Sequence, residues 1–343
     1  MSWLSRAFGG DARVPRDADA ALREALLAVL DQDLERAEEI LAGVVRRDSD
    51  AVEAYLALAR LWRQRGEVGR AIRIHQNLCL RLDPGLPLGR TALLDLAADF
   101  RQGGFLRRAI AAYEEVLGRD PRCAPALRAL VELCAEARDH PRAIEMARRL
   151  ARVEGRDAAG EEARLRVEMA QAAAAEGRSH DARRVVKQAL RRDRGCVRAW
   201  ALLGELEAER GKTRAALAAW LRVPRLDRAA GPSVYPQLEA TYAALGRTRD
   251  YEGLLRELLA ETPPDRGARL ALARTLAARG DAEEAIAELR ALLGAHPDDL
   301  ELRASLGRLL LAEGRDSEAT KEYAELLDVL ERGGLRAGWE GGA

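Results

Sequence analysis

Residues 55–71 read YLALARLWRQRGEVGRA and residues 303–319 read RASLGRLLLAEGRDSEA, and the two stretches share one plan. Each has a large apolar residue, a small residue and a second large apolar residue, then a glycine, and an alanine five residues later. The plan occurs nine times, at spacings of 34 to 39 residues. The positions equivalent to the glycine are Gln32, Gly66, Gly104, Arg138, Gly177, Gly211, Gly246, Gly280 and Gly314. Eight of the nine positions five residues further on are alanine, and the ninth is Tyr251.

Each position in this plan has a physical role. Glycine suits the left-handed backbone that ends a helix, and a small residue lets a second helix approach closely. The pattern resembles the tetratricopeptide repeat (TPR), a helix–turn–helix unit of about 34 residues. The sequence therefore predicts an all-α TPR solenoid, a right-handed superhelix of about nine repeats, because such units bury their cores only against neighbouring units.

We expect the nine repeats to span residues 18–332, between an N-terminal tail at 1–17 and a flexible C-terminal tail at 333–343. The first helix of repeat 1 is rather apolar and has no preceding repeat to cover it. Two alternatives follow: the tail residues Trp3, Leu4 and Phe8 cover this helix, or a partner protein does.

Composition excludes several classes of protein. The 343 residues are 48% hydrophobic and 33% charged, which is enough to fold, and the 56 basic and 56 acidic residues balance. A nucleic-acid-binding protein usually has a basic excess, so we expect no nucleic-acid partner. The longest uncharged run, Ala229–Leu238, is too short to span a membrane, and the first residues have no apolar core of a secretory signal. Four unpaired cysteines are typical of a reduced, cytoplasmic protein.

Motifs that carry chemistry are missing. Gly204, Gly211, Lys212 and Thr213 look like part of a phosphate loop, but the two glycines are separated by six residues instead of four and lie in repeat 6. There is no HExxH, GxSxG or paired CxxC motif, and the four histidines lie in four different repeats. We therefore expect no enzyme, no cofactor and no metal site.

The remaining candidate is the concave groove, which the first helix (helix A) of each TPR repeat lines. Positions set by distance from the turn place an arginine-rich group on the groove wall of repeats 2 to 4. This group consists of Arg60, Arg63, Gln64, Arg101, Gln102, Arg128 and Glu132. Guanidinium groups suit carboxylate-bearing peptides, so we expect proteins or peptides to bind there. The alternative is a solvated wall with no dedicated ligand. On the first view, Arg60→Glu with Arg63→Glu would weaken binding without unfolding the stack, since exposed charges contribute little to stability.

Repeat 2 carries a more specific signal, the segment Arg65–Leu78, which reads RGEVGRAIRIHQNL. It is similar to the corresponding segment of the lipopolysaccharide assembly protein B (LapB) family, RGE-x-x-RAIRIHQ-x-L. The general TPR pattern does not require Arg70, Arg73, His75 and Gln76, so these are the candidate residues specific to that family. The resemblance covers roughly Asp17 to Arg332.

The resemblance implies a cytoplasmic, non-enzymatic adaptor at the inner membrane that brings a lipid A deacetylase to a membrane-bound AAA+ protease. Two features of that family have no counterpart here, its N-terminal transmembrane helix and its C-terminal rubredoxin-like zinc domain. We therefore expect a cytoplasmic protein whose membrane contact, if any, is peripheral. The alternative is a generic soluble TPR scaffold of another envelope, secretion or pilus assembly.

Overall fold

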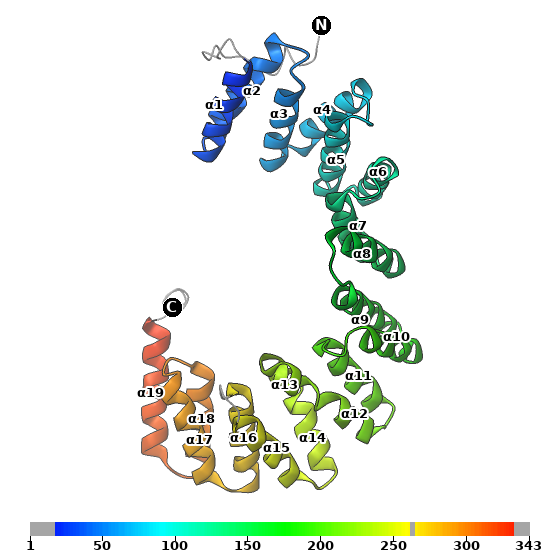
Figure 1. Cartoon of the computed structure of the whole chain (residues 1–343). Helices are drawn as coiled ribbons and strands as arrows, with labels where there is room; N and C mark the ends of the chain where they lie inside the picture. The colour runs from blue at the N-terminus through cyan, green and yellow to red at the C-terminus, as the bar shows by residue number, and fades with distance from the viewer. Residues whose placement is uncertain (1–17, 261–264, 333–343) are drawn as a thin grey trace. The chain divides into compact units, whose positions relative to one another are not determined.

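The computed structural model describes residues 18–260 and 265–332, in which we find nineteen α-helices and no β-strand. The chain forms two compact units that divide between Leu165 and Arg166, inside helix α9 (Ala159–Ala175). In each unit, successive helices lie side by side (Figure 1). The first unit contains α1 (Ala18–Leu30), α2 (Leu34–Arg47), α3 (Val52–Gln64), α4 (Val68–Arg81), α5 (Pro87–Gln102), α6 (Leu106–Arg119), α7 (Ala124–Glu136) and α8 (His140–Glu154).

The second unit continues with helices of similar length, interrupted once. Its elements are α10 (Ser179–Arg192), α11 (Val197–Glu209), α12 (Thr213–Trp220), α13 (Val223–Leu226), the 3-10 helix η2 (Arg228–Ser233), α14 (Tyr235–Ala244), α15 (Thr248–Ala260), α16 (Arg266–Arg279), α17 (Ala282–Ala295), α18 (Leu300–Ala312) and α19 (Asp316–Arg332). The all-α TPR solenoid expected from the sequence is confirmed.

Left-handed backbone ends the first helix of every pair. All nine turn residues have positive φ, between 59° and 94°, including the non-glycine residues Gln32 and Arg138. At the second turn the amide of Glu67 donates to the carbonyl of Trp62 (2.8 Å), the bond that closes a helix in a Schellman motif. One further residue of the described chain, Gly155 after α8, has the same backbone conformation and ends a second helix instead.

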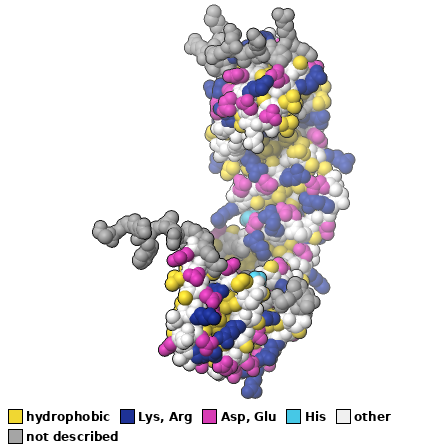
Figure 2. Space-filling model, turned by 90° about the vertical axis from the view of Figure 1, so that its left-hand side faces the viewer, with side chains coloured by type: hydrophobic (Ala, Val, Ile, Leu, Met, Phe, Trp, Pro, Cys, Tyr) yellow, Lys and Arg dark blue, Asp and Glu magenta, His cyan; other side chains and the backbone are white. Residues whose placement is uncertain are grey.

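Small residues hold the two helices of a repeat together. The alanines five residues after the turns are at most 1% exposed, and Tyr251 in the seventh repeat is fully buried. On the facing helix of repeat 6, a Cβ atom added to Gly204 would lie 2.2 Å from Nε1 of Trp220. Trp62 and Leu58 fill the core of repeat 2 and are fully buried. Charged side chains of both signs are interspersed over the outer surface (Figure 2).

Repeat 6 departs from the regular pattern. Its second helix stops after eight residues, at Trp220, and a short helix and η2 follow before α14 begins. Pro224 is the second residue of the short helix, and Pro232 lies inside η2. Proline lacks an amide hydrogen and restricts the residue before it, so a continuous helix cannot form through this segment.

The outer side of α1 is apolar at the surface. Leu26, Leu27 and Leu30 are 60–78% exposed, while Ala21, Ala25 and Ala28 face the core. Trp3, Leu4 and Phe8, expected as one cover for this helix, lie outside the described residues. In residues 18–260 and 265–332 no helix combines the length and the apolar character needed to cross a bilayer.

Candidate functional site

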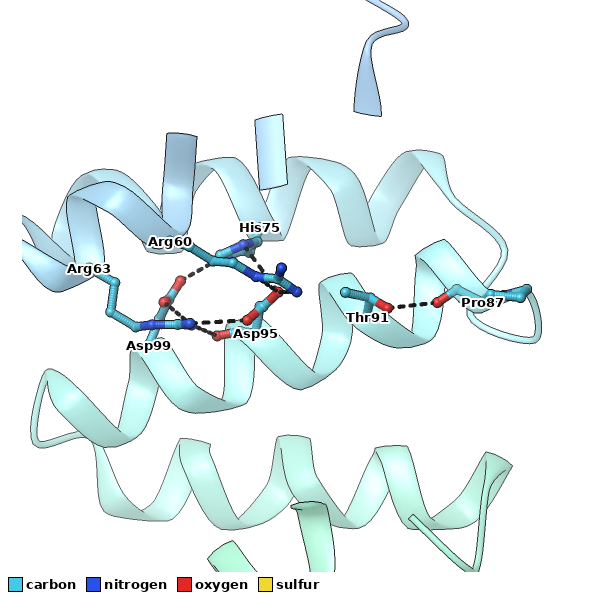
Figure 3. A network of polar contacts seen from close by, with 7 residues as sticks. All are labelled: Arg60, Arg63, His75, Pro87, Thr91, Asp95 and Asp99. Carbon is cyan, nitrogen blue, oxygen red and sulfur yellow. Dashed lines mark hydrogen bonds and ion pairs between the residues drawn. The ribbon is translucent and has the colours of Figure 1, made fainter. Parts of the chain in front are cut away.

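The groove arginines of repeat 2 are tied to two aspartates of repeat 3 (Figure 3). From α3, Arg60 donates through Nε to Oδ2 of Asp95 on α5, at 2.8 Å. Arg63, one turn further along α3, reaches both acids: its Nη2 lies 3.1 Å from Oδ1 of Asp95, and its Nη1 lies 3.0 Å from Oδ1 of Asp99. Nη1 of Arg63 also donates to the backbone carbonyl of Asp95 (3.1 Å). Two guanidinium groups and two carboxylates thus clamp α3 to α5.

His75 closes this network from the core. It lies on α4, is fully buried, and its Nδ1 is 2.6 Å from Oδ2 of the equally buried Asp99. Its other ring nitrogen, Nε2, lies 4.0 Å from Oδ2 of Asp95 and has no hydrogen-bond partner among the described residues. The chain Arg60–Asp95–Arg63–Asp99–His75 therefore runs from the surface to the interior, and we call it the α3–α5 network.

Other predicted groove residues extend the network along the same side of the stack. Gln102 on α5 donates through Nε2 to the backbone carbonyl of Arg63, at 2.9 Å. Arg101 pairs with Glu132 on α7 (2.6 Å), and Arg128 pairs with Glu154 at the end of α8 (2.6 Å). Gln64 is exposed at the end of α3. The structure therefore joins Arg60, Arg63 and Gln102 in one group, and it places Arg101 with Glu132, and Arg128 with Glu154, in two further ion pairs.

The four candidates of the Arg65–Leu78 segment do not form one surface. His75 belongs to the buried end of the network, which explains a histidine there by packing and hydrogen bonding. Arg70 stacks its guanidinium carbon 4.0 Å from the ring centre of Trp62 and pairs with Glu67 (2.6 Å). Arg73 is exposed and donates to the carbonyl of its own helix at Gly69 (3.3 Å). Gln76 lines a separate hollow of about 440 Å³ beside Cys79 and Leu80.

The network corrects one expectation from the sequence. Arg60 is half exposed, but the side chain of Arg63 is only 20% exposed and holds the carboxylate of fully buried Asp99. Replacing Arg63 with glutamate would place a third carboxylate beside two buried ones. The double variant Arg60→Glu with Arg63→Glu therefore tests folding as much as binding. Removing the cation from a buried acid strongly destabilises the folded protein.

Asp95 and Asp99 are the residues that sequence reasoning missed. They interrupt an otherwise apolar stretch, ALLDLAADF at 92–100, and lie four residues apart on one side of the helix. A buried ion-pair cluster could have been predicted from two features of the sequence. Two acids occupy positions of a helix that should face the core, and two arginines lie close together in the repeat before.

The described residues offer little for covalent or metal chemistry. No three His, Cys, Asp or Glu side chains among them come together as a metal site would require. Burial raises the pKa of the Cys79 and Cys134 thiols to about 11, so both are protonated at neutral pH and are weak nucleophiles. What the site does provide is a pair of positioned guanidinium groups. Nη1 of Arg60 has no hydrogen-bond partner in the described part of the chain and is free to donate outward.

Comparisons with known proteins agree with this architecture. Models of the tetratricopeptide repeat family match residues 22–87, 94–160 and 167–230, and a second such model matches 243–299 and 276–330. Lipopolysaccharide assembly protein B of Escherichia coli K12 is 26% identical over 234 residues, which are 68% of this chain and 60% of that protein. The Haemophilus influenzae protein of the same name is 33% identical over 154 residues, 45% of this chain and 39% of that protein.

The chain thus aligns with less than two thirds of either relative. Among solved structures, MamA residues 41 to end from Desulfovibrio magneticus RS-1 is 17% identical and covers 51% of this chain and 98% of its own, with a TM-score of 0.37. With its repeats matched over more than half of its length, the chain belongs to the tetratricopeptide repeat family, and it resembles lipopolysaccharide assembly protein B.

Proposed function

We propose that the chain is a non-enzymatic, protein-binding adaptor of the LapB kind, acting in the regulation of lipopolysaccharide synthesis. In this role it holds a lipid A biosynthetic enzyme and presents it to a membrane protease at the cytoplasmic face of the inner membrane. The observation that supports the proposal most is the similarity to two lipopolysaccharide assembly proteins, together with the Arg65–Leu78 segment in repeat 2.

The α3–α5 network supports a binding role at repeats 2 and 3. Asp95 fixes Arg60 in one orientation, so this guanidinium would lose little conformational freedom when a partner carboxylate binds its outward N–H groups. Gln64, four residues after Arg60 on α3, and Gln102 on α5 are exposed and add hydrogen-bonding groups. We place the first partner contact on Arg60, Gln64 and Gln102, because Arg63 and His75 are engaged inside the protein.

The proposal is tested by tagging the chain in its native host, cross-linking, and identifying what co-purifies from membrane and cytosolic fractions. We expect the lipid A deacetylase, the membrane AAA+ protease, or both. The same experiment with Arg60→Glu should recover less of them, while the exposed arginine variant Arg214→Glu on α12 should behave as the wild type. A partner set that contains neither protein would overturn the lipopolysaccharide role and favour a TPR scaffold of another assembly.

A further inference from the structure

The second unit contains a hollow of about 640 Å³ at the place where repeat 6 is irregular. Two of its lining residues, Arg222 and Leu226, come from the segment where α12 has ended and α13 begins. The opposite wall comes from α10 and from the residues between α10 and α11. The hollow therefore borders the irregular segment of repeat 6.

The floor of this hollow is apolar. Trp200 and three leucines line it, and two of the leucines, Leu190 and Leu203, are only 8% exposed. The indole of Trp200 is held in place because its Nε1 donates to the backbone carbonyl of Arg194, at 2.9 Å. The floor is therefore a recessed surface that an inserted apolar side chain can cover.

The rim of the hollow carries positive charge alone. Lys187, Arg191, Arg194 and Arg222 line it, and no carboxylate does. Lys187 is 3.6 Å from the carboxylate of Glu207, but Arg191, Arg194 and Arg222 are exposed and have no ion pair among the described residues. Arg222 lies over the Trp200 ring, 6.0 Å from its centre. The lining of the hollow thus carries a local excess of arginine without a paired carboxylate among the described residues.

We propose that this hollow, the repeat 5–6 pocket, binds an acidic peptide segment of a partner protein. An apolar side chain of the peptide covers Trp200, and its carboxylates pair with Arg191, Arg194 and Arg222. Arginine forks bind carboxylates in two-point geometry, and an aromatic floor supplies the apolar contact that such interfaces centre on. A membrane surface fits less well, because the buried Leu190 and Leu203 cannot insert into a bilayer but can receive a side chain.

This inference rests on the proposed function in that it takes the chain to bind proteins, and it gives the adaptor a second contact, in the second unit. It is tested with the purified full chain and a fluorescein-labelled peptide, DEDLFEDE, by fluorescence anisotropy. Two control peptides separate the contributions: NQNLFQNQ lacks the charges, and DEDAAEDE lacks the large apolar side chains. We expect DEDLFEDE to bind about tenfold or more tightly than either control, and its affinity to fall as salt is raised.

A pair of matched variants locates the binding. Arg191→Glu with Arg222→Glu should weaken binding of DEDLFEDE about tenfold or more. Arg214→Glu with Arg249→Glu makes the same change in net charge at two exposed arginines outside the pocket that have no ion pair in the described part of the chain, and should leave binding unchanged. Circular dichroism of all variants should match that of the wild type, because all four arginines are exposed and none forms an ion pair among the described residues.

Several outcomes would overturn the proposal. These are no saturable binding of DEDLFEDE up to about millimolar peptide, equal binding of the amide control, or equal losses in the two double variants. Binding of phosphatidylglycerol vesicles, without peptide binding, that is lost in Arg191→Glu with Arg222→Glu would reassign the pocket to a membrane surface. Failure of the lipopolysaccharide role alone would leave this result standing, since the test uses neither the deacetylase nor the protease.

Discussion

The two units differ in whether a cluster of arginines is paired with carboxylates. In the α3–α5 network of the first unit, Arg60 and Arg63 are held by Asp95 and Asp99, two acids that are at most 7% exposed. In the repeat 5–6 pocket of the second unit, Arg191, Arg194 and Arg222 line an apolar floor with no carboxylate among the lining residues. The net charge of the whole chain is zero, but the arginines of the α3–α5 network are neutralised and those of the repeat 5–6 pocket are not. Only the second group has its full charge available to a ligand.

The largest expected difference comes from the same substitution in the two groups. Arg63→Glu removes the cation that serves two buried aspartates and should lower the free energy of unfolding by about 3 kcal/mol or more. Arg191→Glu should change it by less than about 0.5 kcal/mol, because this side chain is exposed and unpaired among the described residues. Urea unfolding followed by circular dichroism measures both. Similar losses in the two variants would break the comparison.

A second prediction concerns the packing next to the pocket. Gly204→Ala would place a methyl group against Trp220 and should destabilise the chain by about 1–3 kcal/mol. The matched change Gly253→Ala, in the middle of α15 with no neighbour within 4 Å, should stabilise it by about 0.5–1 kcal/mol. Opposite signs in thermal or urea unfolding are the expected result. A neutral Gly204→Ala variant would mean that α11 and α12 can separate at little cost.

Arginines pair with buried acids in both units, and Glu207 of the second unit provides a third prediction. Glu207 of α11 is 4% exposed and accepts from Arg183 and Arg210, with Lys187 nearby. Burial by itself raises the pKa of Glu207, but the hydrogen bond from Arg183 and the charges of the three cations outweigh burial, so the pKa lies below its ordinary value. The second unit thus also contains a buried acid that is paired with cations, as in the α3–α5 network.

Because the folded-state pKa of Glu207 is lowered, its ionised form stabilises the fold fully above the unfolded-state pKa of about 4.3. That stabilisation is lost as pH falls through the folded-state pKa. Glu207→Gln should therefore lose less stability than the wild type between pH 5 and the acid range, as measured by urea midpoints at several pH values. Parallel curves for the two proteins would show that Glu207 is not coupled to its cations.

Arg60→Glu should have only a small effect on stability. This side chain is half exposed, and Asp95 keeps Arg63 as a partner, so the loss should stay below about 1 kcal/mol. Recovery of partners in the co-purification experiment should fall nonetheless. A loss comparable to that of Arg63→Glu would mean that the α3–α5 network is cooperative and that its two arginines cannot be treated separately.

Sequence reasoning predicted the repeats well and the polar clusters poorly. The turn residues, the buried alanines and the small residues facing Trp220 follow from local backbone preference and from the size limit where two helices meet. These limits act within one repeat, so they recur in the sequence. Arg63 and Asp95 are 32 residues apart, and Arg191 and Arg222 are 31 residues apart. No local backbone preference brings residues of such separation together.

By itself, then, the sequence determined the helical pairs, their order and the apolar layers between them, because each repeat encodes its own turn and its own core. Only the tertiary structure decided which charges are neutralised. It placed His75 inside the protein against Asp99, tied Arg63 to the same acid, and put no carboxylate among the residues that line the repeat 5–6 pocket. The physical reason is that the energy of a charge depends on its burial and on its neighbours in space, which come from other repeats.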